Sequence, residues 1–280
     1  MTLLNDLLRP VFDWLQWPLT GLPSVVGVLV WSIPVGVFAL WVFGKTSNQD
    51  RIALVKRRIF AGIFEIRLFN DDLRAIMRAQ KEILGHVLHY QALALKPMIF
   101  ILPPLVLVMV QLHQFYGFKA FEPGEELMLT VQLDPETVTP GRRPEVEIEL
   151  PAGIHAVMDP VWVPSLAQLS WRLEIDDWGD YELMIGIDGE SVTKQLRATE
   201  KLVRLSPERP PKSFMGQLEW PSEQPLDPDG PVHSITATYR EGAIGVLGWD
   251  FEWSFAWMVV FFILTMVVAL VLRKPMGVEL

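Results

Sequence analysis

The chain has 280 residues, half of them hydrophobic, with a mean hydropathy of +0.27 and a formal net charge of −9. A hydropathy this high is unusual for a soluble domain, and the acidity argues against DNA as a partner. The absence of cysteine excludes disulfides and thiol chemistry.

Residues 1–22 are predicted to form an amphipathic helix that lies on the outer membrane surface. Leucine, valine and phenylalanine recur at helical spacing on one side, while Asp6, Arg9, Asp13 and Gln16 lie opposite. Such a helix is expected to place its apolar side in the lipid interface.

Three stretches concentrate the apolar residues: Val25 to Phe43, Pro97 to Leu112 and Ser254 to Leu272. Crossing about 30 Å of hydrocarbon takes about 20 helical residues. We therefore predict three membrane-crossing helices, at residues 23–44, 97–118 and 251–273. The alternative is a soluble protein with three buried core helices, but such helices rarely lack a polar face over this length.

Residues 45–96 are predicted to form a basic helical hairpin. The stretch from Ser47 to Leu95 lacks proline and is rich in good helix formers. Both of its ends must return to the membrane, so a turn is expected at Leu68 to Asp72, where an aspartate can cap the second helix. The two arms are expected to pack against each other as a coiled coil through their apolar residues, namely Ile52, Val55, Ile59, Ile63 and Ile66 on the first arm and Leu73, Ile76, Met77, Ile83, Leu84, Val87 and Leu88 on the second. A peptide-binding groove is the functional alternative.

The distribution of charge predicts the orientation. Residues 44–96 carry ten basic and five acidic side chains, whereas residues 117–252 carry eleven basic and twenty-five acidic ones. Basic residues beside membrane helices are retained in the cytoplasm. We expect a multi-pass protein of a bacterial plasma membrane, with its N-terminus outside and a cytoplasmic tail at 274–280.

Residues 119–205 are predicted to form an extracytoplasmic, all-β, immunoglobulin-like sandwich. Five short runs with strand-like patterns lie there between proline, glycine and aspartate signals. Asp177 to Tyr181 resembles a tyrosine corner, in which the ring hydroxyl binds backbone. Residues 206–250 are rich in proline and are expected to be a linker and membrane-proximal segment.

The sequence contains no phosphate-binding loop, dinucleotide fingerprint, zinc-protease motif or hydrolase elbow. We therefore predict no enzymatic activity, no cofactor, no catalytic residues and no metal site.

The order of these elements resembles the core of the YidC/Oxa/Alb membrane-insertase superfamily. It is similar to the three-helix branch that contains the third subunit of the ER membrane complex. The residues that carry the resemblance are Thr46 to Pro104, with Lys45 to Arg51 leading into the hairpin, Leu68 to Arg74 at its tip and Lys96-Pro97 at its return. The resemblance implies an α-helical membrane protein that assists the insertion or folding of membrane segments through a polar groove.

Two departures from that superfamily stand out. Its members often keep a cation inside the groove, and none of the three apolar stretches, Val25 to Phe43, Pro97 to Leu112 and Ser254 to Leu272, contains one. A groove here would depend on Ser32, Thr46, Gln111 or backbone freed by prolines. The immunoglobulin-like insert is the second departure.

The basic residues Arg51, Lys56, Arg57 and Arg58 are predicted to form a cytoplasmic docking face for a ribosome or for anionic lipid. The alternative is that they only fix the orientation. The expected partners of the whole protein are the lipid bilayer, a ribosome or nascent membrane protein, and an extracytoplasmic protein. The competing function is a membrane-anchored binding or scaffold subunit whose β domain captures an envelope partner.

Overall fold

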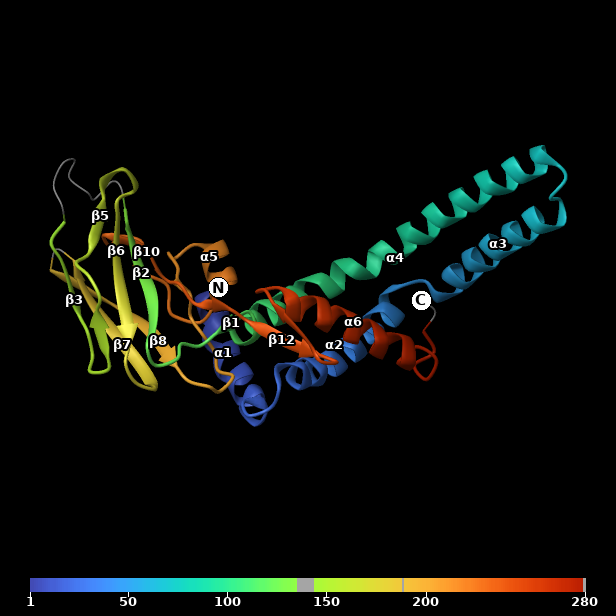
Figure 1. The fold of residues 1–280 in the computed structure, drawn as a ribbon. Helices are drawn as coiled ribbons and strands as arrows, with labels where there is room; N and C mark the ends of the chain where they lie inside the picture. Colours follow the sequence, from blue (N-terminus) through green and yellow to red (C-terminus); the bar gives the residue numbers. More distant parts are fainter. Residues whose placement is uncertain (135–143, 188, 279–280) are drawn as a thin grey trace. The chain divides into compact units, whose positions relative to one another are not determined.

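The computed structural model describes residues 1–134, 144–187 and 189–278 (Figure 1). The chain forms two compact units. One comprises Met1–Val28 and Leu107–Val259, and the other comprises Leu29–Val106 and Val260–Leu280. The first contains the β domain and the ends of three apolar helices that adjoin it in the chain, and the second contains the remaining parts of those helices and a helical hairpin.

Two helices in the described part of the chain are long and apolar enough to cross a membrane, namely α2 (Ser24–Thr46) and α4 (Leu73–Tyr116). A third apolar helix, α6 (Ala256–Leu272), has 17 residues. It begins later than expected because Trp249–Glu252 form a strand, β13. Aromatic and acidic residues alternate there, which gives the period of two of a strand.

Within the second unit, α3 (Gln49–Leu68) and the first part of α4 form the expected hairpin (Figure 1). Asp72 Oδ1 accepts hydrogen bonds from the backbone N–H groups of Arg74 and Ala75 over 2.9 and 3.2 Å, which caps α4. The arms touch where Gly62 faces Ile83 and Ala79, since a Cβ at Gly62 would meet the Ile83 side chain. The second arm and the second apolar stretch form one continuous helix.

The β domain is inserted between α4 and α6, and its strands pair antiparallel. One sheet has the order β4-β6-β2-β10-β9, with β5 also paired to β6, and the other has the order β3-β7-β8. Two further pairs are β1-β11 and β12-β13. The strands are β1 (Phe118–Lys119), β2 (Glu125–Leu133), β3 (Val146–Glu149), β4 (Ile154–Ala156), β5 (Val161–Val163), β6 (Gln168–Ile175), β7 (Gly179–Ile187), β8 (Glu190–Ala198), β9 (Glu208–Arg209), β10 (Val232–Ala237), β11 (Arg240–Glu241), β12 (Ala243–Val246) and β13.

The two larger sheets share one hydrophobic core. Leu129 and Trp171 contribute from the first sheet and Leu183 and Ile185 from the second, and all four are buried. Alternate residues along β2, β6 and β7 face this core. The strands predicted from this alternation are all present, with ends shifted by one or two residues.

The tyrosine corner has the expected hydrogen bond, because the Tyr181 hydroxyl donates to the Asp177 carbonyl over 2.7 Å. Its ring lies against Gly153. The φ of Gly153 is +92°, a backbone conformation that favours glycine. A larger residue at position 153 would meet the ring. Tyr181 therefore links the β6-β7 connection to the turn that precedes β4.

The segment expected to be a linker, 206–250, is more ordered than predicted. It contains β9, the short helix α5 (Phe214–Glu219) and β10, and β10 pairs with β2 inside the larger sheet. The register shifts between Val232 and Ser234, which interrupts the alternation of buried residues. This irregularity and the flanking prolines conceal the strand in the sequence.

The β domain leaves and rejoins the helices at nearly the same point. Phe118 pairs with Glu241, and the Gly242 N–H donates to the Gly117 carbonyl over 2.9 Å. A Cβ at Gly242 would collide with the backbone of Tyr116 and Gly117. The close approach of the two chain segments requires glycine here.

Candidate functional site

Helix α1 (Thr2–Gln16) packs in an unusual way, because much of its polar side faces the protein. Asn5 is buried and donates to the Gln217 carbonyl over 2.7 Å, and Gln16 is buried as well. Leu3, Leu7 and Trp14 are exposed instead. A helix on a soluble domain normally buries its apolar side. The apolar side of α1 therefore faces away from the part of the protein that α1 packs against.

Arg204, which follows β8, is buried at the centre of this polar contact, with 7% of its surface exposed. Its Nε binds Asp13 Oδ1 over 2.7 Å, and its Nη1 donates to Gln111 Oε1 over 2.9 Å. The guanidinium carbon lies 4.8 Å from the centre of the Phe115 ring. Its Nη2 is buried and has no hydrogen-bond partner among the described residues. Burial lowers the pKa of Arg204, and Asp13 opposes that shift. A guanidinium stays charged nonetheless.

The C-terminal end of α4 contacts three other segments. Gln16 donates to the Tyr116 hydroxyl over 2.9 Å, and that hydroxyl also lies against Gly27 at the beginning of α2. Trp257, at the beginning of α6, donates to His113 Nδ1 over 3.3 Å. A polar layer of Gln16, His113, Tyr116 and Trp257 therefore joins the N-terminal ends of α2 and α6 to the C-terminal end of α4.

A cavity of about 750 Å³ lies beside this layer. Its lining includes the Thr20 to Ser24 turn, Tyr116, Lys119, Lys201 and Gly242. Charged, apolar and backbone groups all border it, so the cavity has a mixed lining beside the N-terminal end of α2 and the C-terminal end of α4.

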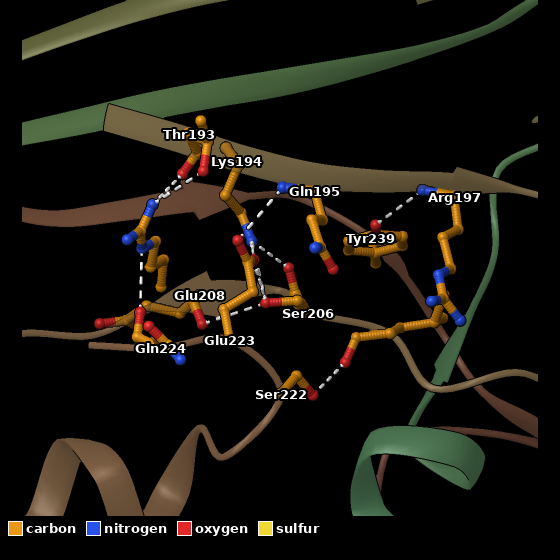
Figure 2. A network of polar contacts seen from close by, with 12 residues as sticks. Thr193, Lys194, Gln195, Arg197, Ser206, Glu208, Ser222, Glu223, Gln224 and Tyr239 are labelled. Carbon is orange, nitrogen blue, oxygen red and sulfur yellow. Dashed lines mark hydrogen bonds and ion pairs between the residues drawn. The ribbon is translucent and has the colours of Figure 1, made fainter. Parts of the chain in front are cut away.

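A second polar network is enclosed within the β domain (Figure 2). Lys194 of β8 is fully buried and forms an ion pair with Glu223, and its Nζ also donates to the Ser206 carbonyl over 2.5 Å. Glu223 Oε2 accepts from the Gln195 N–H over 3.2 Å. Burial lowers the pKa of Lys194, while the Glu223 carboxylate opposes the shift. The network fixes the 206–226 segment to β8.

The Lys194 ammonium also lies 3.0 Å from Ser206 Oγ, a pairing that some hydrolases use to activate serine. Here Glu223 binds both the ammonium and the hydroxyl, and all three side chains are buried. A nucleophile requires access to substrate, and this serine is enclosed. We therefore assign the cluster a structural role.

The predicted groove residues are divided between two helices, with Ser32 and Thr46 on α2 and Gln111 on α4. Ser32 and Thr46 lie on the same helix, α2, and 14 residues of helix correspond to about 21 Å. The Ser32 hydroxyl donates to the Phe261 carbonyl over 3.4 Å, and the Thr46 hydroxyl donates to the Val42 carbonyl over 2.7 Å. Gln111 lies in the first unit, where it binds Arg204.

The predicted docking residues lie in the first half of α3. Arg51, Arg57 and Arg58 are exposed, while Ile52 and Val55 are buried on the other side of the helix. Lys56 is half-buried and lines a cavity of about 340 Å³ with Arg273 and Lys274. The four cations therefore divide between an exposed face and a basic cavity beside the end of α6.

The helical hairpin leaves many large apolar side chains exposed. The prediction that Ile63 of α3 and Leu73, Met77, Leu84 and Leu88 of α4 pack between the arms is wrong, because all five are exposed. The exposed set on α3 includes Phe60, Phe64 and Leu68, which follow one another at intervals of four residues. On α4 they are Leu73, Met77, Leu84, Leu88 and Leu95. Spacings of four and seven residues place each set on one side of its helix. We call these two sets the apolar stripes.

One cluster had no signal in the sequence. His155, Glu174 and Asp176 come together on β4 and at the end of β6. His155 Nδ1 lies 3.0 Å from Asp176 and its Nε2 lies 3.8 Å from Glu174. The hydrogen bond to Asp176 raises the pKa of His155. Both ring nitrogens face a carboxylate, an arrangement that suits a protonated histidine.

Comparison with protein-family models and with curated protein sequences gives no match. The functional argument therefore depends on the chain's own geometry.

Proposed function

We propose that this chain is a membrane protein of the insertase type, similar to the YidC/Oxa/Alb superfamily, which assists the insertion of apolar segments into a bilayer. In this proposal α2, α4 and α6 cross the membrane, the hairpin lies in the cytoplasm and an immunoglobulin-like β domain lies outside. The 17 residues of α6 span about 26 Å, which suffices with modest thinning of the bilayer.

The observation that carries the proposal is the pair of apolar stripes on the hairpin. A contiguous exposed apolar surface commonly marks an interaction site. The narrow contact between the arms, at Gly62, Ala79 and Ile83, leaves the stripes uncovered within the described residues. Each stripe is long enough to bind a helical apolar segment of a substrate. The segment would leave water and contact these side chains before it enters the lipid.

The buried Arg204 and the cavity beside the polar layer support the second part of the proposal, which is the passage of a substrate's hydrophilic flank. A substrate that enters a bilayer must also bring a hydrophilic flank across, and a charge at mid-bilayer costs several kcal/mol. Arg204 provides a buried cation beside Gln111 of α4, although the three apolar stretches of the sequence contain none. The adjacent 750 Å³ cavity would let water accompany that flank on the outer side.

The competing proposal is a binding or scaffold subunit. Its β domain would capture an envelope partner, and the helices would act as an anchor. An anchor has no use for apolar stripes on a hairpin at the other end of its helices. The two proposals therefore differ in whether substitutions on the apolar stripes should impair function.

The test is insertion of a single-spanning substrate with a short translocated flank into liposomes that contain the purified protein. We expect the wild-type chain to increase protected substrate several-fold over empty liposomes. Replacing Leu84 and Leu88 with Gln should abolish most of this gain, because both lie on the α4 stripe.

The matched control replaces Arg78 and Glu82 with Gln. Both residues are exposed on the same helix, lie off the stripe and have opposite charges, so the net charge is unchanged. Equal loss in both variants, or no gain with the wild-type chain, would refute the insertase proposal. Recovery of a fixed set of envelope proteins without insertion activity would favour the scaffold.

A further inference from the structure

The β12-β13 hairpin, Ala243–Glu252, exposes apolar side chains in an arrangement that the core does not explain. The pairs Ile244↔Phe251 and Val246↔Trp249 lie on one side of this ribbon, and Ala243↔Glu252 and Gly245↔Asp250 lie on the other. One side is therefore aliphatic and aromatic, and the other is small and acidic. On the apolar side Ile244 is buried against the protein, whereas Trp249 is 74% exposed and Phe251 is also exposed.

The tip of the hairpin is more unusual. Leu247 and Gly248 form the turn, and both have positive φ, 52° and 86°. Turns of this kind favour Asn-Gly, because a leucine in the left-handed region is strained. Leu247 nevertheless occupies the first position and is 97% exposed. A fully hydrated leucine at a strained position implies a surrounding other than water.

The position of the hairpin in the chain indicates which surrounding this is. Glu252 ends β13, and the apolar helix α6 begins four residues later at Ala256. Trp253 and Phe255, both exposed, fill the gap. Tryptophan beside the end of an apolar helix is typical of the membrane interface. The hairpin therefore begins where the bilayer surface should lie.

We propose that the β12-β13 hairpin inserts its tip into the outer leaflet, with Leu247 and Trp249 in contact with lipid. This inference rests on the membrane location in the proposed function. Strands of four residues are about 13 Å long. The interfacial layer on each side of a bilayer is about 5–8 Å thick. The hairpin can therefore pass through that layer and bring Leu247 to the edge of the hydrocarbon, but it cannot cross the membrane.

The charges on the hairpin identify the driving force. Residues 243–252 include Asp250 and Glu252 and no cation. Attraction to anionic lipid therefore contributes nothing, and burial of apolar surface must drive insertion. The hairpin should enter neutral phosphatidylcholine membranes, and added salt should not release it.

The cysteine-free chain allows a direct test with single environment-sensitive probes. Leu247→Cys, labelled with a nitrobenzoxadiazole fluorophore, is reconstituted as the full chain in phosphatidylcholine vesicles. Quenching is measured with doxyl-labelled lipid and with aqueous iodide. Ile99→Cys, on the apolar part of α4, provides the lipid reference, and Ser191→Cys, on β8, provides the aqueous reference. Trp249→Cys provides a second hairpin position should Leu247→Cys fail to fold.

We expect the hairpin probes to be quenched by doxyl lipid and to show several-fold weaker iodide quenching than the probe at 191. Strong iodide quenching at 247 and 249, with lipid quenching at 99, would overturn the hairpin inference and leave the membrane location intact. Shielding from iodide without doxyl quenching would show a protein partner in place of lipid and would overturn it too. Iodide access at 99 would reject the membrane location itself.

Discussion

Lys194 and Glu223 form an ion pair that the β domain encloses, with 0% and 6% of the two side chains exposed. Both charges are also hydrogen-bonded, Lys194 to the Ser206 carbonyl and Glu223 to the Gln195 N–H. The pair thereby connects β8 to a segment nearly thirty residues further along the chain.

Removing one member of this pair should be costly. Lys194→Met would leave the Glu223 charge buried and unpaired, and we expect a loss of about 3–5 kcal/mol of unfolding free energy. Adding Glu223→Gln should recover part of it, since glutamine is neutral and can still accept from the Gln195 N–H. Denaturant titrations followed by near-ultraviolet circular dichroism measure both variants. A double variant no more stable than Lys194→Met would contradict the coupling.

The tyrosine corner allows a more modest test. Tyr181→Phe removes the donor to the Asp177 carbonyl and should cost about 1–2 kcal/mol. Glu182→Gln, at an exposed position on the same strand, serves as the control and should change stability by less than about 0.5 kcal/mol. Equal effects of the two substitutions would mean that the hydroxyl does not stabilise the corner.

His155 should make stability depend on pH. Its folded-state pKa is raised by the hydrogen bond to Asp176, so the protonated form is favoured in the folded chain. The stabilisation is full below the unfolded pKa of about 6.5 and is lost as pH rises through the higher folded value. The melting temperature of the wild-type chain should exceed that of His155→Gln at pH 5.5, and the difference should shrink above neutral pH. A constant difference would rule out this histidine as the cause.

Contacts between residues close in the sequence could be predicted, whereas contacts between distant segments could not. The Asp72 cap and the Tyr181 corner depend on residues within four positions of each other, and the structure has both hydrogen bonds. Arg204 with Gln111 and Lys194 with Glu223 join segments distant in the chain, so no local pattern announces them. Strand β10 was missed because its bulge breaks the period of two.

Orientation across the membrane stays a prediction and has a simple test. Single cysteines at Ser47 and Ser191 should label from opposite sides of intact vesicles with an impermeant maleimide. The excess of basic residues in 44–96 should keep Ser47 in the cytoplasm. Labelling of both positions from the same side would reject the assigned topology.

The docking hypothesis concerns Lys56, Arg57 and Arg58. Replacing all three with Gln should weaken association with ribosomes or anionic liposomes, since each surface cation near anionic lipid contributes about 1 kcal/mol. The effect should diminish as salt is added. Co-sedimentation across a salt series measures it. The control replaces Arg67, Arg74 and Arg78, which removes the same charge near the hairpin tip. Equal loss of binding in both triple variants would mean that Lys56, Arg57 and Arg58 have no special role in docking.

The pairing of Phe118 with Glu241, and the bond between Gly242 and Gly117, have a consequence for how such a chain could arise. Both ends of the β domain meet within one short ladder, so the helices on either side are joined as they would be by a tight turn. A long insert with adjoining ends adds little strain to its host. The helical part could therefore have existed before the β domain and could have acquired it in a single insertion event. A chain in which a short glycine-serine turn replaces residues 118–241 would show whether the helices still fold as the ancestral module.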